Sequence, residues 1–224
     1  MQAPSLTQLV LEFLRNRIIT GELSPGKRLN ENELSSTLEV SRHPIREAFR
    51  VLESEKLVFS IPNRGTFVTE ISAEDLIEVY QAREMIECYA IDLLEMNNTT
   101  ELPELESSIE SASRLTVPTG DDPQQYLEFH KAFATFHIKM IEATGNSRLI
   151  LFYNSIRLNL ARYQFKNILR PGRIKIDNDE HRQILDLLKK SNFAEAKYSL
   201  KLHVTKRLKD VDGILYDIVN EKTI

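Results

Sequence analysis

The segment from residue 21 to residue 68 constrains the fold most, because one short helix within it carries two opposite faces. Ser41 is expected to begin this helix, since a serine hydroxyl can accept a hydrogen bond from an unpaired amide in the first turn. Pro44 fits that first turn, where its missing N–H costs little. Arginines recur on one face at four-residue spacing and apolar side chains fill the other. The basic face holds Arg42, Arg46 and Arg50, and the apolar face holds Ile45, Ala48, Phe49 and Leu52. A helix that reads the DNA major groove needs these two faces.

Shorter elements on either side extend this helix into a helix-turn-helix with a wing. A preceding short helix is expected to start at Asn30 or Glu31, and a tight turn joins it to the basic helix. Downstream, residues 57–59 and 66–68 are rich in strand-forming residues, and turn signals fill residues 60–65 between them. This pattern predicts a β-hairpin wing with a basic tip. A row of arginines can also be a solvated helix face, but the order of helix, turn, helix and hairpin favours DNA binding.

The same segment resembles the winged-helix domain of GntR-family bacterial transcription regulators, over residues 5–70. The resemblance rests on Pro25-Gly26, on residues 40–48 and on the pair Arg64-Gly65. It implies that residues 1–70 form a winged helix-turn-helix DNA-binding domain.

The chain departs from the family pattern at three positions. Lys56 stands where the family usually has Gly, and Ser35 stands where it usually has Ala. Neither change removes an expected DNA contact. His43 stands where a small polar residue is common, which leaves the base preference at that position open.

The resemblance also implies how this domain contacts DNA. Arg42, His43 and Arg46 are expected to reach base edges in the major groove, where one arginine can donate two hydrogen bonds to guanine. Arg50, later in the helix, is expected to touch phosphate. The other expected contacts go to the DNA backbone or the minor groove, from Asn32, Ser41, Arg64 and Gly65. One such helix reads few base pairs, so a homodimer on a two-fold symmetric double-stranded operator is expected.

The charge of the chain does not by itself indicate a nucleic-acid partner. The formal net charge is −4. Residues 1–70 carry nine Lys and Arg against nine Asp and Glu, so the excess of acid lies in the rest of the chain. The clustering of arginines on one surface matters more for DNA binding than this total.

Cysteine content and hydropathy indicate a cytoplasmic protein without membrane contact. Cys88 is the only cysteine, so no disulfide forms within one chain, as suits a reducing compartment. It is expected to be a small buried hydrophobe rather than a redox sensor. No apolar run approaches the roughly 20 residues of a transmembrane helix, and no signal peptide is visible.

After residue 70 the pattern becomes helical throughout, which predicts an all-α second domain over residues 71–224. The fold class expected for the whole chain is therefore mainly α, with a winged helix-turn-helix domain followed by a helical bundle. The expected helices span about 73–96, 101–115, 122–144, 147–169, 177–190 and 193–211, with a short tail. Breaks between them fall at Asn, Gly, Pro and Thr clusters such as Pro171-Gly172.

Three histidines lie among the inward apolar positions of three of these helices. They are His137, His181 and His203. Three imidazoles that converge inside a bundle can hold Zn²⁺, Ni²⁺ or a similar ion and leave open coordination positions. A single core histidine is more often hydrogen-bonded than metal-bound, and spacing alone does not show that these three meet.

Residues 72–212 resemble the FCD ligand-binding domain, which is the helical partner in the FadR branch of GntR regulators. Many FCD domains hold a divalent metal through one Asp and three His, and the three His correspond to His137, His181 and His203. The Asp normally stands four residues before the first His, where this chain has Phe133. Three alternatives follow: a metal held by the three His alone, recruitment of His130, or loss of the metal with an anion held by hydrogen bonds. The first is preferred.

The resemblance further implies a small carboxylate effector and dimerisation through the helical domain. Arg83 either forms an ion pair with Glu87 one turn later or grips the carboxylate of the effector. Asn159 and Arg162 are additional effector-binding candidates, with Tyr163 beside them.

The function expected from these features is a metabolite-responsive transcription regulator and not an enzyme. One alternative is a metal-dependent enzyme that uses the three histidines to activate water. No general base stands at a clear spacing from them, and this alternative leaves the arginine face unexplained. The other is a winged-helix module that binds only proteins, which the arginine face argues against.

Overall fold

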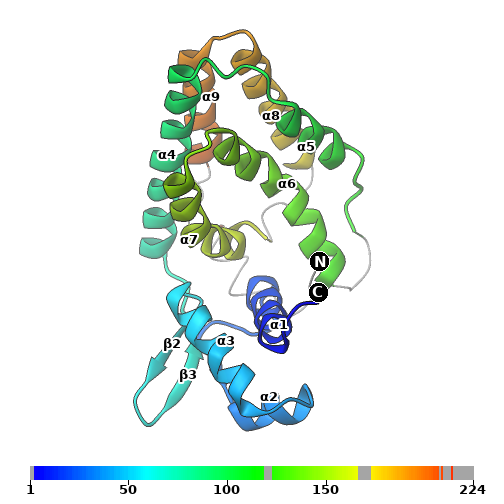
Figure 1. Ribbon diagram of the computed structural model, residues 1–224, viewed down its shortest axis with the longest axis vertical. Coiled ribbons are helices and arrows are strands. Elements are labelled where there is room, and N and C mark those ends of the chain that lie inside the picture. The colour runs from blue at the N-terminus through cyan, green and yellow to red at the C-terminus, as the bar shows by residue number, and fades with distance from the viewer. Residues whose placement is uncertain (1–2, 119–122, 166–172, 207, 209–212, 214–224) are drawn as a thin grey trace. The chain divides into compact units, whose positions relative to one another are not determined.

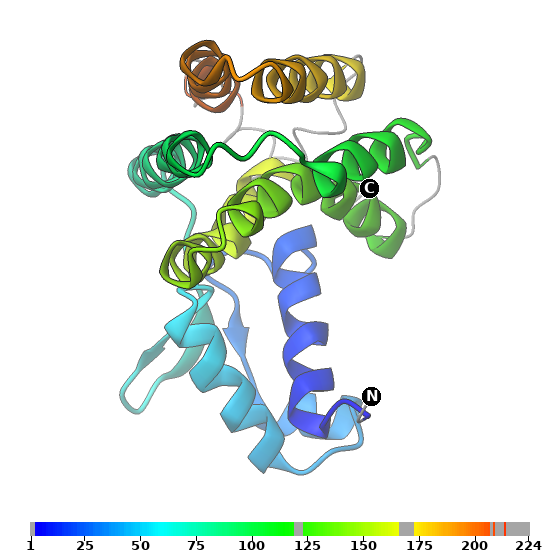
Figure 2. The same ribbon diagram turned by 45° about the horizontal axis from the view of Figure 1, so that its top comes forward.

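The computed structural model describes residues 3–118, 123–165, 173–206, 208 and 213, and the chain divides into two compact units. The first unit ends at Ser72 and the second begins at Ala73. Figure 1 and Figure 2 show the first as a small helical unit with a hairpin and the second as a bundle of helices. Within the described residues, no helix is both long enough and apolar enough to cross a membrane.

The first unit is the predicted winged helix. Its helices are α1 (Leu6–Thr20), α2 (Glu31–Thr37) and α3 (Arg42–Ser54). Its strands are β1 (Arg28–Leu29), β2 (Val58–Ile61) and β3 (Gly65–Val68), in the antiparallel order β1-β3-β2. The hairpin prediction is confirmed, with strands slightly longer than expected. The sequence pattern did not predict β1, which pairs Arg28 with Phe67, because two residues are too few to show an alternation.

The apolar face of α3 forms the centre of this unit, as predicted. Its buried residues are Pro44, Ile45, Ala48, Phe49 and Leu52. The expected N-cap at Ser41 is correct in position but wrong in its hydrogen bond, because the Ser41 side chain caps no amide. Pro44 lacks an N–H, so the first turn has one fewer amide to satisfy.

The turn between α2 and α3 is tight because one residue adopts a left-handed conformation. Glu39 has φ +54°, and the Ser35 hydroxyl donates to the Val40 carbonyl at 2.6 Å. The Asn30 side chain caps the start of α2 by accepting from the amides of Asn32 and Glu33. Ser35, where the family favours Ala, therefore fastens the end of α2 to the turn.

Lys56 also has a left-handed backbone, with φ +61°. This conformation costs a non-glycine residue about 1–2 kcal/mol, and Gly adopts it without that cost. We therefore expect Lys56→Gly to raise the free energy of unfolding by about 1 kcal/mol in urea titrations. Lys56→Ala removes the same charge but keeps the Cβ, and it should give no such gain. Equal stability of the two variants would contradict the explanation.

The second unit contains α4 (Ala73–Met96), α5 (Pro103–Ser113), α6 (Pro123–Ala143), α7 (Ser147–Gln164), α8 (Arg173–Lys189) and α9 (Phe193–Thr205). The all-α prediction is confirmed for the described residues of this unit. Helix α4 contacts α6, α7 and α9, and α8 contacts α5, α6 and α9. Figure 2 shows α8 and α9 side by side. The expected ends at 166–169 and 209–211 lie outside the described residues.

The start of α8 differs from the prediction. It begins at Arg173, four residues before the expected start at residue 177. The apolar Ile176 is exposed here while the polar Asp177 and His181 are buried, so this part of the helix lacks the usual amphipathic pattern. The earlier start places Asp177 inside a helix, with its side chain buried.

Cys88 lies half-buried on α4 rather than fully in the core. Burial, followed by the charge of Glu84, raises the pKa of its thiol to about 11. A rise from the usual value of about 9 lowers the thiolate fraction about a hundredfold below pH 9. We therefore expect slow alkylation by iodoacetamide at pH 8 in the folded protein and fast alkylation in urea. Equal rates in the two states would contradict the assignment of Cys88 as an unreactive thiol.

Candidate functional site

The outer face of α3 is solvent-exposed along its whole length. Arg42, His43, Arg46 and Arg50 are all exposed, whereas the residues of the inner face are buried. Asn32 on α2 and Ser41 at the start of α3 are exposed as well. The helix therefore presents the predicted basic surface to solvent.

Two of these arginines are paired with acids in the absence of DNA. The Arg46 guanidinium donates to Glu31 at 2.8 Å, and the Arg50 guanidinium donates to Glu47 at 2.9 Å. The Arg46 side chain is 58% exposed, and exposed ion pairs contribute about 0–1 kcal/mol. Such pairs are weak enough to be exchanged for bases or phosphates.

The wing adds a second basic position. Arg64 and Gly65 are exposed at its tip, where Asn63 has φ +62° and Gly65 has φ +105°. A Cβ on Gly65 would lie 3.2 Å from Nε of Arg28, so the glycine lets the Arg28 side chain pass close to the strand. The sequence pattern did not single out Arg28, because the strand that places it beside the wing is only two residues long.

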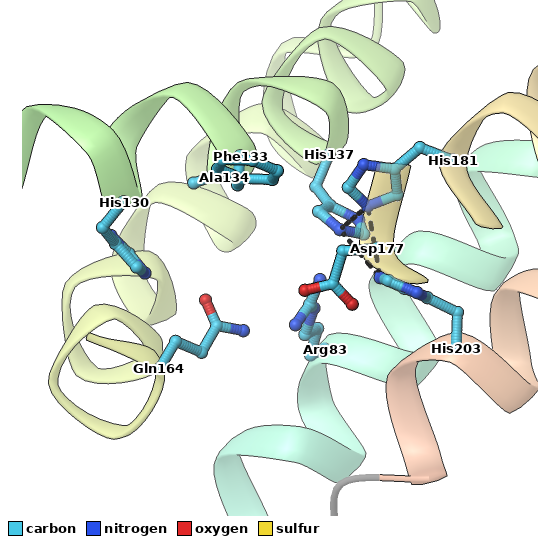
Figure 3. Close-up of a pocket in the computed structure, with 9 residues that line it drawn as sticks. All are labelled: Arg83, His130, Phe133, Ala134, His137, Gln164, Asp177, His181 and His203. Carbon is cyan, nitrogen blue, oxygen red and sulfur yellow. Dashed lines mark hydrogen bonds between the residues drawn. The ribbon is translucent and has the colours of Figure 1, made fainter. Parts of the chain in front are cut away.

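The second unit brings the three predicted histidines together. His137 comes from α6, His181 from α8 and His203 from α9, and all three are buried. Their Nε2 atoms lie 3.1 Å apart for His181 and His137, and 3.3 Å apart for the other two pairs. Figure 3 shows the three rings pointing toward one another from separate helices.

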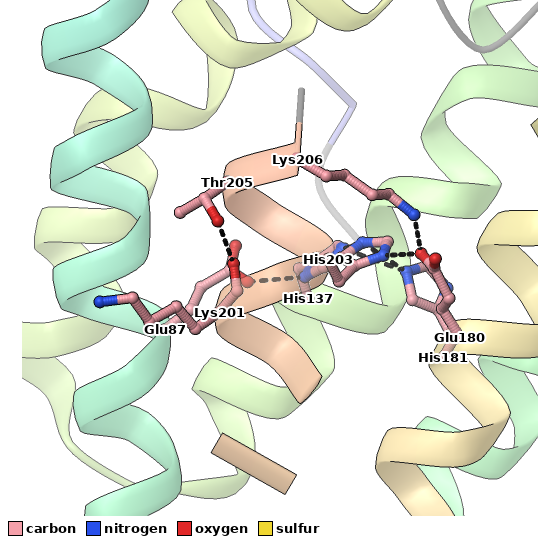
Figure 4. Close-up of polar contacts among 8 residues, drawn as sticks. All are labelled: Glu87, His137, Glu180, His181, Lys201, His203, Thr205 and Lys206. Atoms are coloured by element: carbon pink, nitrogen blue, oxygen red, sulfur yellow. Dashed lines mark hydrogen bonds and ion pairs between the residues drawn. The ribbon is translucent and has the colours of Figure 1, made fainter. Parts of the chain in front are cut away.

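Carboxylates bind two of these rings at Nδ1, the ring nitrogen that faces away from the cluster. His137 Nδ1 donates to Glu87 at 2.8 Å, and His203 Nδ1 donates to Glu180 at 2.7 Å (Figure 4). Glu180 also accepts from Lys206. Since Nδ1 carries the proton in both rings, Nε2 of each neutral ring presents a lone pair to the centre of the cluster.

Two lone pairs that face each other at 3.3 Å repel unless a cation or a shared proton lies between them. Burial, followed by the charges of His203 and His137, lowers the pKa of His181 well below its usual value. His181 is therefore held in its neutral form, with a lone pair on one of its ring nitrogens. Nitrogens bound to zinc at about 2.0–2.1 Å in a tetrahedron are about 3.3–3.4 Å apart, close to the spacing found here. The donor set fits a divalent metal.

Some of the other predicted site residues line the histidine pocket and some do not. Phe133, His130, Arg83, Gln164 and Asp177 line the same pocket. His130 is buried there but is not among the nitrogen donors that converge within 4.8 Å. Asn159 and Arg162 are buried on α7, and neither is among the described residues that line this pocket. Gln164, two residues after Arg162 on the same helix, lines the pocket instead, and the sequence pattern did not single it out.

Arg83 forms the first of its two expected contacts, the ion pair with Glu87. Its guanidinium donates to Glu87 at 2.6 Å, so the ion pair exists. The pair is buried, with Arg83 3% and Glu87 0% exposed, so it is far from the exposed pair that the spacing alone suggests. Burial opposes the charge of Arg83, but the charge of Glu87, the nearby Tyr153 and Tyr80 and the hydrogen bond to Glu87 together outweigh it and raise the pKa of the guanidinium. Arg83 is a fixed cation in the wall of the histidine pocket.

Comparisons with known proteins agree with this architecture. Residues 6–68 match the model for bacterial regulatory proteins of the gntR family, and residues 78–206 match the FCD domain. The chain belongs to the GntR family of transcription regulators. As a family member it is a DNA-binding regulator with an FCD domain, and it is not an enzyme.

Individual relatives support the same assignment for this GntR regulator. It is 28% identical to the HTH-type transcriptional regulator YdhC of Bacillus subtilis, over 88% of each chain. It is also 28% identical to the gluconate operon transcriptional repressor of Bacillus licheniformis, over 77% of this chain and 68% of the relative. A solved GntR structure from Rhodococcus sp. RHA1 superposes with a TM-score of 0.71 and 26% identity, over 94% of this chain and 99% of that one.

Proposed function

We propose that this regulator binds a two-fold symmetric operator as a homodimer, and that a small carboxylic acid bound with a divalent metal in the histidine pocket controls that binding. The observation that carries the proposal is the triangle of Nε2 atoms, with a fixed arginine in the same pocket wall. The pocket thus combines a metal-binding donor set with a group that binds carboxylates.

His137, His181 and His203 would hold Zn²⁺ or Ni²⁺, and Glu87 and Glu180 would orient two of the rings. Carboxylates behind metal-binding histidines fix the tautomer and raise the basicity of the ligand. A divalent ion in a site with an open position supplies a binding point for a carboxylate oxygen of the acid.

Arg83 would bind the other end of the acid. A guanidinium carries five N–H donors in a planar fork, of which Nε–H goes to Glu87. The remaining donors suit a second carboxylate or hydroxyl oxygen. One relative is the repressor of a gluconate operon, which supports a sugar acid or a similar small acid as the effector class.

The DNA-binding surface would comprise α3, the start of α2 and the wing. We assign base contacts to Arg42, His43 and Arg46, and contacts to the DNA backbone or minor groove to Asn32, Ser41, Arg50, Arg64 and Gly65. Coupling between the two sites must be reciprocal: if the acid weakens operator binding, the operator weakens acid binding by the same factor.

The test is operator affinity in the presence of acids. Fluorescence anisotropy on duplexes from the upstream intergenic DNA, at fixed salt with competitor, gives the affinity of the metal-loaded protein. At least one sugar acid, hydroxy acid or dicarboxylic acid should change it about 5-fold or more, and the corresponding amide should not. An equal response after chelation of the metal would refute the metal-bound effector, and the absence of specific DNA binding would refute the operator proposal.

A further inference from the structure

Asp177 is a buried carboxylate in the histidine pocket. It is 2% exposed and lies on α8, one turn before His181. Residues four apart on a helix share one face, so Asp177 and His181 project to the same side of α8.

The Asp177 carboxylate lies close to the histidine cluster. One of its oxygens is within 4.8 Å of a ring nitrogen of His203 and of a Glu180 oxygen, so Asp177 borders the three-histidine group at His203 and is not yet within 4.8 Å of all three ring nitrogens. Figure 3 shows the carboxylate pointing into the pocket, on the side where His203 and Arg83 lie. Its charge also acts on His181, where it partly offsets the lowering of the pKa by burial.

Phe133, one turn before His137 on α6, is an apolar ring that packs in a cluster with a residue of α8. Phe133 is 4% exposed and packs with Ala112 and Phe129, with ring centroids 5.2 Å apart for the two phenylalanines. Ile174 of α8, three residues before Asp177, packs against this cluster. The two helices thus present a ring from α6 and a carboxylate from α8, each one turn before a histidine of the cluster.

The nearby glutamates contact the outer nitrogens of two rings. Glu87 accepts from Arg83 and from Nδ1 of His137, and Glu180 accepts from Lys206 and from Nδ1 of His203. Both lie behind the rings, on the side away from the Nε2 triangle. Asp177 is the carboxylate among the described residues that line the pocket.

We propose that Asp177 is the fourth protein ligand of the metal, so that three histidine nitrogens and one α8 carboxylate oxygen form the coordination shell. This inference rests on the proposed metal site. Zn²⁺ accepts Asp oxygens at about 2.0–2.2 Å and can expand to five-coordination, so three nitrogens and one Asp oxygen still leave a position for the acid. The carboxylate also lowers the net charge that the ion brings into a buried site.

Metal affinity of the full-length protein tests the proposal. In competition titrations with Zn²⁺, Asp177→Asn should weaken binding at least tenfold, because the amide replaces an anionic ligand by a neutral one. Asp179→Asn is the matched control, since Asp179 is exposed on the same helix two residues later. It should leave the affinity unchanged. If the wild-type protein binds no metal, the proposed metal site itself fails. If it binds and Asp177→Asn binds equally well, only the role of Asp177 fails.

A second variant gives a positive signal even if Asp177→Asn folds poorly. Asp177→Cys should give a thiolate-to-cobalt charge-transfer band in the near ultraviolet when Co²⁺ is added, because the side chain at 177 would touch the ion. The wild-type protein, which contains Cys88, and the Asp179→Cys variant should not give the band. Absence of the band in a Co²⁺-bound Asp177→Cys protein would overturn the proposal.

Discussion

Replacing Arg46 with Ala is expected to weaken operator binding by about 10- to 100-fold per half-site and to reduce the preference for operator over unrelated DNA. A bidentate arginine–guanine contact contributes about 1–3 kcal/mol of discrimination. Arg46 lies at the centre of the exposed face of α3, and only a weak exposed pair with Glu31 must be broken to release it. Anisotropy titrations on operator and scrambled duplexes at the same salt measure both quantities.

Two further variants distinguish base reading from general charge. Arg50→Ala should weaken binding to operator and scrambled DNA alike and lower the slope of log affinity against log salt by about 1. Arg148→Ala removes an exposed arginine from α7 and should change neither affinity. Unchanged operator affinity in Arg46→Ala would refute its assignment to the bases.

Replacing His181 with Ala is expected to abolish both metal binding and the stabilisation that metal provides. A ligand at 100 times its dissociation constant stabilises the folded state by about 2.7 kcal/mol. Wild-type protein with Zn²⁺ should therefore unfold at higher urea than chelated protein, and the His181→Ala protein should show no difference. The comparison is made within each protein, so the cost of the cavity left by the ring cancels.

His43→Ala is the matched control, because His43 is an exposed histidine of the other unit. It should keep the full stabilisation by metal. If His181→Ala were stabilised by Zn²⁺ as strongly as the wild-type protein, the three-histidine site would be refuted.

Local patterns predicted most of the winged helix. The four-residue spacing of arginines and the opposite apolar face determine α3, and the turn-rich segment after it predicts the wing. Two features depend on contacts that no local pattern contains. The Arg28 side chain lies beside the wing only because β1 pairs with β3. The preference of the family for Gly at position 56 is explained by the left-handed backbone angle that Lys56 adopts there.

The pocket was predictable only in part. Family resemblance named its three histidines, but their Nδ1 partners are residues distant in sequence, because Glu87 is 50 residues from His137 and Glu180 is 23 from His203. Asp177 could have been noticed, since it stands four residues before His181. The predicted start of that helix at residue 177 left the orientation of the Asp177 side chain undefined.

Operator affinity of the wild-type and His181→Ala proteins, with and without the acid identified by screening, tests the central claim most directly. The two proteins should bind operator equally well without the acid, because the substitution lies in the other unit. The acid should change the affinity of the metal-loaded wild-type protein about 5-fold or more and leave that of His181→Ala unchanged. An equal change in both proteins would contradict the claim that the histidine pocket controls DNA binding.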